Sequence, residues 1–314
     1  MIVVVTGGAG FIGANLCRHL GADPAVESVI AFDDLSTGTA ENLHGVDVEL
    51  VEGSILDDDL LRSVTQRADA IVHLAARPSV PRSVADPVTT HEVNARGTVC
   101  VLEAARRTGA HVVVASSSSV YGANPELPKH EAMATRPMSP YAASKLAAES
   151  YALSWQHSFG LPTLAFRFFN VFGPLQGADH AYAAVVPAFV SAALSDRPLT
   201  VHGDGSQTRD FTYVDTVCEV IADAVRRRVT SEDPVNLAYG TRTGLLEVIE
   251  ILQELLERDL SIEHTEPRVG DVPHSQAANE RLRELFPDVA PVPVRPGIER
   301  TVEWFRSRPV GALR

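Results

Sequence analysis

A glycine-rich turn directly after the first apolar segment is the feature that most constrains the fold. Residues 2–5 are apolar and β-branched, TGGAGFIG follows at residues 6–13, and an apolar helical pattern runs from there to residue 20. Gly7 and Gly10 would allow a tight turn whose backbone N–H groups approach a pyrophosphate at the helix N-terminus. Gly13 would let the helix pack closely on the sheet. The spacing therefore predicts a dinucleotide-binding turn.

Short apolar segments alternate with helical ones through the first half of the chain. We expect strands at 2–5, 29–32, 48–51, 70–74, 111–116 and 163–168, with helices that include 11–20, 87–107 and 140–159. The strand segments are apolar on both faces, which is typical of a parallel sheet covered by helices on both sides. The alternation predicts an α/β fold with a Rossmann-type doubly wound parallel sheet.

The pattern changes after about residue 170, where Pro and Gly become more frequent. A helix at 216–228 and a strand at 234–238 indicate a return to the sheet, and 243–258 is typical of an amphipathic helix. At roughly 150 residues per domain, the 314 residues predict about two domains. We expect a Rossmann-type domain at 1–170, joined by 211–238, and a smaller C-terminal lobe formed by 171–210 and 239–314.

The charge balance argues against two classes of partner. There are 27 Lys and Arg residues against 40 Asp and Glu, a net charge of −13, and no basic tract. Nucleic acids and anionic membranes bind basic surfaces, so we expect neither as a partner. Phosphate groups would have to be held by a few arginines and by backbone N–H groups.

The cysteines and the N-terminal segment predict a cytoplasmic location. Cys17, Cys100 and Cys218 lie far apart without a paired motif, which favours free thiols in a reducing compartment. No basic segment precedes the first apolar run, and no apolar run is long enough to span a bilayer. The eleven histidines form no HExxH or HxxxH pair, so we expect no metal site.

Two acidic residues at the end of the second predicted strand indicate which dinucleotide is bound. Asp33 follows Gly13 by twenty residues and precedes Asp34. A carboxylate there can accept both ribose hydroxyls and would repel a 2′-phosphate, which favours NAD over NADP. Small residues in HLAA, at 73–76, would let the cofactor lie across the strand ends. His73 itself could equally be a core residue.

A tyrosine, a lysine and a run of serines form the candidate catalytic group. SSSSVYG occupies 116–122, and PYAASK opens a helix at 140–145. The i,i+4 spacing places Tyr141 and Lys145 on one helix face. Tyrosine has a pKa of about 10, which the Lys145 ammonium and a positive nicotinamide ring would lower. A strand-end serine could hydrogen-bond the same substrate oxygen. The alternative is an amphipathic helix with an exposed lysine.

Together these motifs resemble the extended short-chain dehydrogenase/reductase family, in its group of NAD-dependent nucleotide-sugar epimerases and dehydratases. TGGAGFIG, Asp33, HLAA, the serine strand end and YAASK occur in the family's order. RFFNVFGP at 167–174, GDGSQTRDF at 203–211 and PRVGDVPHS at 267–275 extend the resemblance over nearly the whole chain. It implies a UDP-sugar substrate held by the C-terminal lobe, and a homodimer formed through helices 87–107 and 140–159.

The resemblance also implies a role for individual residues. Tyr141 would act as base and acid, Lys145 would tune its pKa and bind the nicotinamide ribose, and Ser117, three residues before Val120, would bond the sugar O4. The implied cofactor-binding residues are Gly7, Gly10, Phe11, Ile12, Gly13, Asp33, Asp34, Ser54, Ile55, Leu74, Ala75, Ala76, Asn94, Tyr141 and Lys145. The implied substrate-binding residues are Ser79, Arg82, Ser117, Ser118, Tyr141, Asn170, Val186, Arg209, Arg268, Asp271 and Ser275. Ser54 departs from the family, which often has Asp there to meet adenine.

The serine cluster bears on which reaction follows the first oxidation. Family dehydratases and uronate decarboxylases carry an acidic residue just after the active-site Ser or Thr, where this chain has Ser118 and Ser119. A hydroxyl is a poor acid–base group near neutral pH, which favours 4-epimerisation of a UDP-sugar. A dehydratase, a decarboxylase and a non-catalytic NAD-binding regulator remain the alternatives.

The identity of the sugar also stays open. Ser275 stands where family members with Tyr exclude a 2-acetamido group, so UDP-GlcNAc and UDP-GalNAc are expected alongside UDP-glucose and UDP-galactose. Ser117–Ser119 could instead bond the C6 carboxylate of UDP-glucuronate or UDP-galacturonate.

Overall fold

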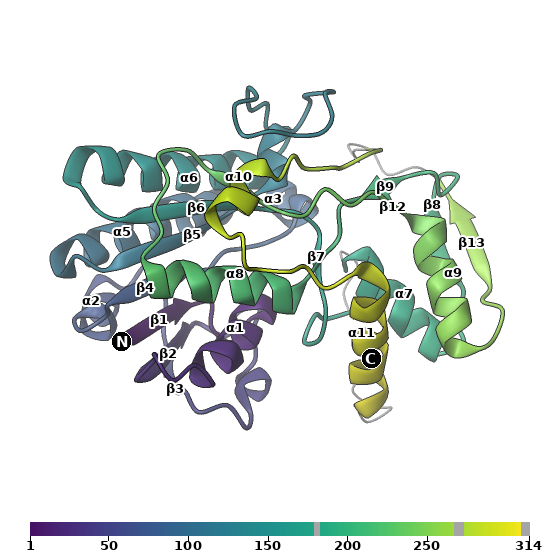
Figure 1. The fold of residues 1–314 in the computed structure, drawn as a ribbon, viewed down its shortest axis with the longest axis horizontal. Coiled ribbons are helices and arrows are strands. Elements are labelled where there is room, and N and C mark those ends of the chain that lie inside the picture. Colours follow the sequence, from purple (N-terminus) through teal and green to yellow (C-terminus); the bar gives the residue numbers. More distant parts are fainter. Residues whose placement is uncertain (179–182, 267–272, 309–314) are drawn as a thin grey trace.

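A seven-stranded parallel sheet forms the centre of the computed structural model, which describes residues 1–178, 183–266 and 273–308 (Figure 1). Its strands lie in the order β11 (Val235–Leu237), β6 (Thr163–Phe168), β5 (His111–Ser117), β4 (Ala70–His73), β1 (Ile2–Thr6), β2 (Ser28–Asp33) and β3 (Glu49–Glu52). Every pairing in this sheet is parallel. The carboxyl ends of all seven strands therefore meet along one edge.

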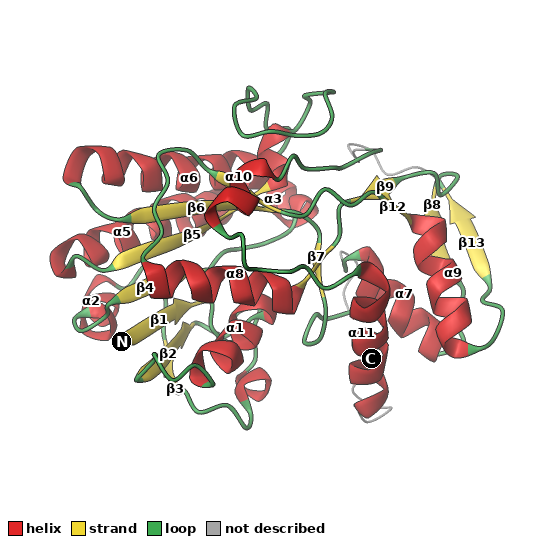
Figure 2. Cartoon of the chain, viewed as in Figure 1, coloured by secondary structure: helices red, strands yellow, loops and turns green. Residues whose placement is uncertain are grey.

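Helices cover both faces of the sheet (Figure 2). On one face α1 (Phe11–Gly21) packs against α8 (Val214–Arg227), and on the other α5 (Gly97–Thr108) contacts α2 (Asp58–Thr65) and α6 (Pro140–Phe159). The buried side chains divide into two large apolar clusters accordingly, and successive residues of one strand belong to opposite clusters. Burial on both faces explains the continuous apolar strand segments.

The predicted α/β class and Rossmann-type sheet are confirmed. The six strands expected in the first half differ from the observed ones by at most one residue at either end. The helix at 140–159 has the predicted bounds, with Ser139 accepting a hydrogen bond from the Ala142 N–H at its N-terminus and Gly160 in a left-handed conformation after its end. The strand expected at 234–238 does return to the sheet, where β11 pairs with β6.

The prediction of one continuous helix over 87–107 is wrong. The segment divides into α4 (Pro87–His91), a π-helical turn η2 (Glu92–Arg96) and α5. Asn94 lies in the wide turn, where its side-chain oxygen accepts from the Arg77 N–H at 2.6 Å and its amide donates to the Ser144 hydroxyl at 3.0 Å. These hydrogen bonds stabilise the local departure from α-helical geometry. Such π-turns are frequent at functional sites.

The remaining elements form a smaller lobe beside the sheet, visible at the right of Figure 1. It contains α7 (Val185–Leu194), α9 (Leu245–Leu256) and α11 (Val294–Ser307), with the parallel pair β8 (Leu199–His202) and β13 (Ile262–Thr265). Two further pairs join β7 (Val171–Phe172) to β10 (Thr212–Tyr213) and β9 (Thr208–Arg209) to β12 (Thr243–Gly244).

The end of the chain does not belong to the smaller lobe alone. Helix α10 (Glu280–Leu285) packs against β11, so part of the chain after residue 239 also covers the central sheet. We keep the predicted division into two domains as a proposal. No helix in the described ranges combines the length and the apolar character needed to cross a bilayer.

Candidate active site

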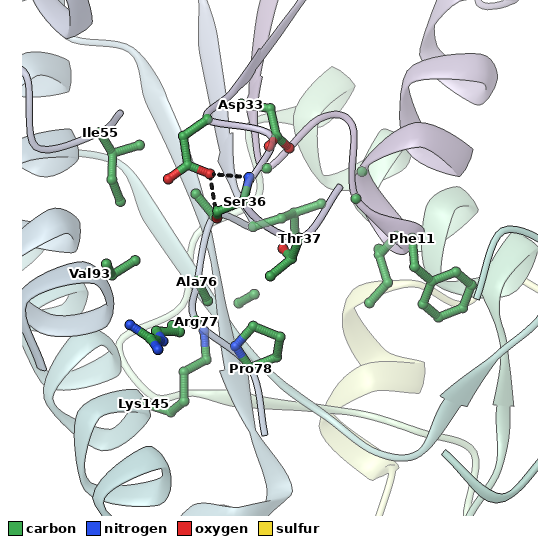
Figure 3. A pocket seen from close by; sticks show the side chains of 18 of the residues that line it. Phe11, Asp33, Ser36, Thr37, Ile55, Ala76, Arg77, Pro78, Val93 and Lys145 are labelled. Carbon is green, nitrogen blue, oxygen red and sulfur yellow. Dashed lines mark hydrogen bonds between the residues drawn. The ribbon is translucent and has the colours of Figure 1, made fainter. Parts of the chain in front are cut away.

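A cavity of about 770 Å³ opens at the carboxyl edge of the central sheet. Sequence-predicted residues that line it are Gly7, Gly10, Phe11, Ile12, Gly13, Asp33, Asp34, Ser54, Ile55, Leu74, Ala75, Ala76, Arg82, Ser117, Tyr141 and Lys145. In Figure 3, Ile55 and Val93 lie on one side of this cavity and Phe11 on the other. The expected catalytic residues and all the expected cofactor-binding residues except Asn94 thus face one space.

The glycine turn after β1 leaves room for backbone and nothing more. Gly7 has φ of +72°, and a Cβ there would lie 2.7 Å from the Ala75 backbone nitrogen. A Cβ on Gly13 would lie 2.0 Å from the Gly7 carbonyl oxygen, inside any permitted contact. Gly10 precedes α1 without a side-chain cap, so the first-turn N–H groups of α1 remain suited to an anion. This cradle fits a pyrophosphate.

Asp33 and Asp34 are held in place at the end of β2. The Asp33 carboxylate accepts from the Ala9 N–H at 2.9 Å and from the Leu35 N–H at 2.8 Å. Burial raises the pKa of Asp33, while these backbone bonds act in the opposite direction. Asp34 accepts from the backbone and hydroxyl of Ser36, at 3.0 and 2.6 Å. The residues present therefore fit the ribose of NAD.

Tyr141, Lys145 and Ser117 come together where β5 ends and α6 begins. The Tyr141 hydroxyl is hydrogen-bonded to Ser117, and all three side chains line the cavity. Ser117 also accepts from the backbone and hydroxyl of Ser119, at 3.2 and 2.9 Å. These bonds fix the Ser117 oxygen beside the phenol, so both groups can reach one substrate oxygen.

The pKa of Tyr141 differs from the sequence-based expectation. Burial raises the pKa of Tyr141, and the hydrogen bond to Ser117 offsets only part of this rise. Burial also lowers the pKa of Lys145, to about 8. The protein groups alone thus move the tyrosine pKa upward, contrary to the lowering expected from Lys145. A lowered pKa depends on the positive nicotinamide ring, the second half of that expectation.

His73 is a core residue and does not line the cavity. Its ring nitrogens pair with the hydroxyls of Thr6 at 2.8 Å and Thr98 at 3.0 Å. Burial, with a smaller contribution from Lys145, lowers its pKa to about 3. The imidazole is therefore neutral, and it supports the strand ends beneath the site.

Three predicted residues of this region do not line the cavity. Asn94 is buried, and its side chain is hydrogen-bonded within the protein. Ser79 caps α3 (Val80–Ala85) by accepting from the Arg82 N–H. Ser118 begins the turn η3 (Ser118–Tyr121). Sequence reasoning in turn missed lining residues that include Ser36, Thr37, Arg77, Pro78, Val93, Ser116 and Gln176. Ser36 and Thr37 lie close after Asp34, and Arg77 and Pro78 follow HLAA. This closeness in sequence could have indicated that they line the cavity.

A second cavity of about 300 Å³ lies in the smaller lobe and shares Val171 with the first. Asn170, Val186 and Arg209, all predicted to bind substrate, line it. Arg209 donates to the carbonyls of Thr208 at 3.0 Å and Pro273 at 3.1 Å. Ser275 does not line this cavity, but its N–H donates to the Thr208 carbonyl at 3.0 Å. Arg268 and Asp271 lie outside the described residues.

A buried ion pair connects α6 to two strands. Glu149, one turn after Lys145 along α6, accepts from Arg167 of β6 at 2.6 and 2.9 Å. Its carboxylate also accepts from the Ser116 hydroxyl of β5 at 2.7 Å. Both charged side chains are about 4% exposed. The pair therefore sets the position of α6, and with it Tyr141 and Lys145, relative to Ser117.

Comparison with known proteins identifies the family. Residues 3–238 match the model of the NAD dependent epimerase/dehydratase family. A UDP-glucose 4-epimerase of Mycolicibacterium smegmatis is 38% identical over 98% of this chain and 99% of its own length. UDP-glucuronic acid decarboxylase 1 of Arabidopsis thaliana is 31% identical over 98% of this chain and 70% of its length.

Solved structures agree with the sequence comparison. The UDP-N-acetylglucosamine 4-epimerase of Methanobrevibacter ruminantium M1, in complex with UDP-N-acetylmuramic acid, superimposes with a TM-score of 0.91. It is 35% identical, and the match covers 97% of this chain and 98% of that one.

The Glu149–Arg167 pair yields a stability prediction. We expect Glu149→Gln to lower the free energy of unfolding by about 3–5 kcal/mol, because it leaves the Arg167 guanidinium buried without its counter-charge. Urea unfolding of the two proteins measures the difference. The exposed pair of Glu254 and Arg295 supplies the control, since Glu254→Gln should change stability by less than about 1 kcal/mol. Equal effects of the two substitutions would contradict the role given to the buried pair.

Proposed function

Because the chain belongs to the NAD-dependent epimerase/dehydratase family, we propose that it interconverts UDP-sugars that differ in configuration at C4. The observation that carries the proposal is the grouping of Tyr141, Ser117 and Lys145 in the same cavity as the glycine turn and Asp33. This grouping supports proton transfer at a sugar oxygen next to a dinucleotide.

NAD is the cofactor, and the chain supplies a cradle for it. The N-terminus of α1 suits the pyrophosphate, Asp33 and Asp34 suit the adenosine ribose, and Lys145 suits the nicotinamide ribose. When bound, NAD supplies a hydride acceptor, and in reduced form a donor, for the sugar C4.

Tyr141 moves the proton in the proposed reaction. As phenolate it takes the proton from the sugar O4–H, and as phenol it returns that proton to O4 of the 4-keto sugar. Ser117 holds O4 through a hydrogen bond and keeps the phenol oxygen next to it. The two half-reactions need no other proton carrier if the keto sugar turns over between them and presents its other face.

The lining of the large cavity favours epimerisation over elimination or decarboxylation. Among its described lining residues, only Asp33 and Asp34 carry carboxylates, and both lie at the end of β2. The position after Ser117 is Ser118, which does not line the cavity. A dehydratase or decarboxylase would need an acid–base group at the sugar.

The deciding experiment is incubation of the purified protein with UDP-glucose, UDP-GlcNAc and UDP-glucuronate, followed by NMR of the products. A C4 epimer supports the proposal. Loss of water indicates a dehydratase, and release of CO₂ indicates a decarboxylase. NAD binding without turnover indicates a regulator.

We further propose that the sugar pocket admits 2-acetamido sugars as well as glucose and galactose. Ser275 offers a small hydroxyl, and its N–H bond to Thr208 keeps it next to the strand that carries Arg209. Arg82 lines the large cavity together with Tyr141 and supplies a guanidinium on the side of the catalytic residues. That cation, with Ser117 in the same cavity, also suits the carboxylate of a uronate substrate.

A homodimer is the proposed assembly, formed through the helices around α6. Val84 and Val88 are 65% and 71% exposed on α3 and α4, and both helices contact α6. Tyr151 and Phe159 of α6 are also exposed, at 39% and 53%. Large apolar side chains grouped on neighbouring helices favour burial in a subunit interface.

Replacement of Tyr141 tests the proton-transfer role. We expect Tyr141→Phe to abolish turnover and to leave NAD bound, because only the hydroxyl that exchanges the O4 proton is removed. Product NMR and the NAD content of the purified protein are the measurements. Tyr151→Phe, an exposed tyrosine of the same helix, is the matched control and should retain activity. Substantial activity in Tyr141→Phe would rule out the assignment.

Substitution at Ser275 tests the sugar selectivity. We expect Ser275→Tyr to reduce kcat/KM for UDP-GlcNAc by about tenfold or more relative to UDP-glucose, since overpacking costs about 1–3 kcal/mol. The ratio of the two kcat/KM values is the measurement, with Ser275→Ala as the control that adds no volume. Equal losses for both sugars would show that Ser275 does not gate the pocket.

A charge on the exposed apolar helices tests the dimer. We expect the unmodified protein to sediment as a dimer at micromolar concentration and Val88→Asp to shift it toward monomer, because the substitution buries a carboxylate in the interface. Leu246→Asp, at an exposed leucine of α9, is the control and should not alter sedimentation. A monomeric unmodified protein would refute the proposal.

A further inference from the structure

Asp210 is a fully buried carboxylate that the proposed chemistry does not use. It is 0% exposed and lies between Arg209 and Phe211, outside the lining of both cavities. Its oxygens accept four hydrogen bonds: from the Gly240 N–H at 3.0 Å, the Thr241 N–H at 3.2 Å, the Thr241 hydroxyl at 2.9 Å and the Ala277 N–H at 2.9 Å. The charge is thus met by backbone and hydroxyl donors.

The donors come from two segments that are distant in sequence. Gly240 and Thr241 follow β11 and so continue directly from the central sheet, whereas Ala277 lies two residues after Ser275 in the C-terminal part of the chain. Each of these segments makes its bonds to the same carboxylate. Asp210 therefore holds the central sheet and the Ser275 segment at a fixed separation.

The backbone of Asp210 extends the connection to a third segment. Its carbonyl accepts from the Asn170 side chain at 3.1 Å, and Asn170 lines the second cavity beside Arg209. The Thr208 backbone continues the contact to the C-terminal segment by bonds to Pro273 and Ser275, each of 3.0 Å. Three residues are proposed to bind the nucleotide sugar. Arg209 belongs to β9, Ser275 is hydrogen-bonded to Thr208 of β9, and Asn170 is hydrogen-bonded to Asp210, the next residue.

We propose that Asp210 is a positioning residue for the nucleotide-sugar site, which fixes the relative positions of Asn170, Arg209 and Ser275 without touching the ligand. The inference rests on the proposed function, because these three residues bind substrate only if a UDP-sugar is the substrate. It predicts a loss of nucleotide affinity when the carboxylate loses its acceptor capacity.

The cost of burying this carboxylate supports a dedicated role. Burial raises the pKa of Asp210 to about 6, even though the bonds from Ala277, Thr241 and Gly240 act to lower it. A buried carboxylate that served packing alone would be replaced at little cost by an apolar residue of similar volume. A carboxylate that accepts four donors from separate segments cannot be so replaced, because those donors would be left unpaired.

The experiment compares Asp210→Asn with the unmodified protein. The substituted amide keeps the shape of the side chain, but its NH₂ group faces donors, so the segments must separate. We expect the affinity for UDP, measured by calorimetry on the NAD-loaded protein, to fall about tenfold or more. The NAD content should be unchanged, and the KM for the UDP-sugar should rise while kcat stays within about twofold.

Two further variants keep the inference testable if Asp210→Asn does not fold. Thr241→Val removes one of the four bonds and leaves the backbone N–H in place, so UDP affinity should fall by a smaller factor. Thr241→Ser retains the hydroxyl and should restore the affinity. Asp215→Asn, an exposed carboxylate of α8 paired with Arg300, is the matched control and should bind UDP normally.

Each outcome decides the matter. If the unmodified protein binds UDP and both Asp210→Asn and Thr241→Val keep that affinity within about twofold, the inference is wrong and the proposed function stands. An equal fall of kcat and NAD content in Asp210→Asn would indicate general disruption and would also overturn it. If the unmodified protein does not bind UDP, the proposed function is wrong, and the inference falls with it.

Discussion

The close approach of backbone at the turn after β1 is the constraint on which the site depends. The Gly7 N–H donates to the Phe32 carbonyl of β2, a Cβ on Gly7 would strike Ala75 after β4, and Asp33 accepts from Ala9 within the turn. Three strand ends are thus joined through one segment that has no room for a side chain at Gly7, Gly8 or Gly13. The same crowding that excludes Cβ atoms leaves backbone N–H groups as the surface of the cavity, which is what a pyrophosphate needs.

Buried carboxylates organise the two halves of the site in different ways. Glu149 meets a full counter-charge in Arg167, whereas Asp210 meets only backbone and hydroxyl donors. An ion pair tolerates small movements of long side chains, but four hydrogen bonds, three from backbone N–H groups and one from a hydroxyl, fix distances more tightly. Helix α6 is therefore attached to the sheet by one buried ion pair, and the segments that carry Asn170, Arg209 and Ser275 are attached to each other by several hydrogen bonds.

The sequence was informative where structure follows from local pattern and less so where it depends on contacts between distant segments. The strands, the glycine turn and the Tyr141–Lys145 helix face could be read from spacing, because periodicity and turn chemistry determine them. The π-turn at 92–96 could not, since its cause is the bonding of Asn94 to Arg77 and Ser144, which lie on other segments. Nor could the hydrogen bonds of Asp210, which span the chain from Asn170 to Ala277. The raised pKa of Tyr141 in the protein alone could not be predicted for a third reason: burial raises it, and the sequence does not give the extent of burial.

The raised pKa of Tyr141 determines how the proposed reaction is controlled. In the protein alone, burial favours the neutral phenol of Tyr141, and a neutral phenol cannot take the O4 proton. Burial also lowers the pKa of Lys145, to about 8, so the lysine keeps its charge at neutral pH and loses it at mildly alkaline pH. A positive charge added beside the phenol shifts the balance toward phenolate, and loss of that charge shifts it back. In the proposed reaction, Tyr141 would therefore act as a base next to the oxidised cofactor and as an acid next to the reduced one, which is the order that 4-epimerisation requires.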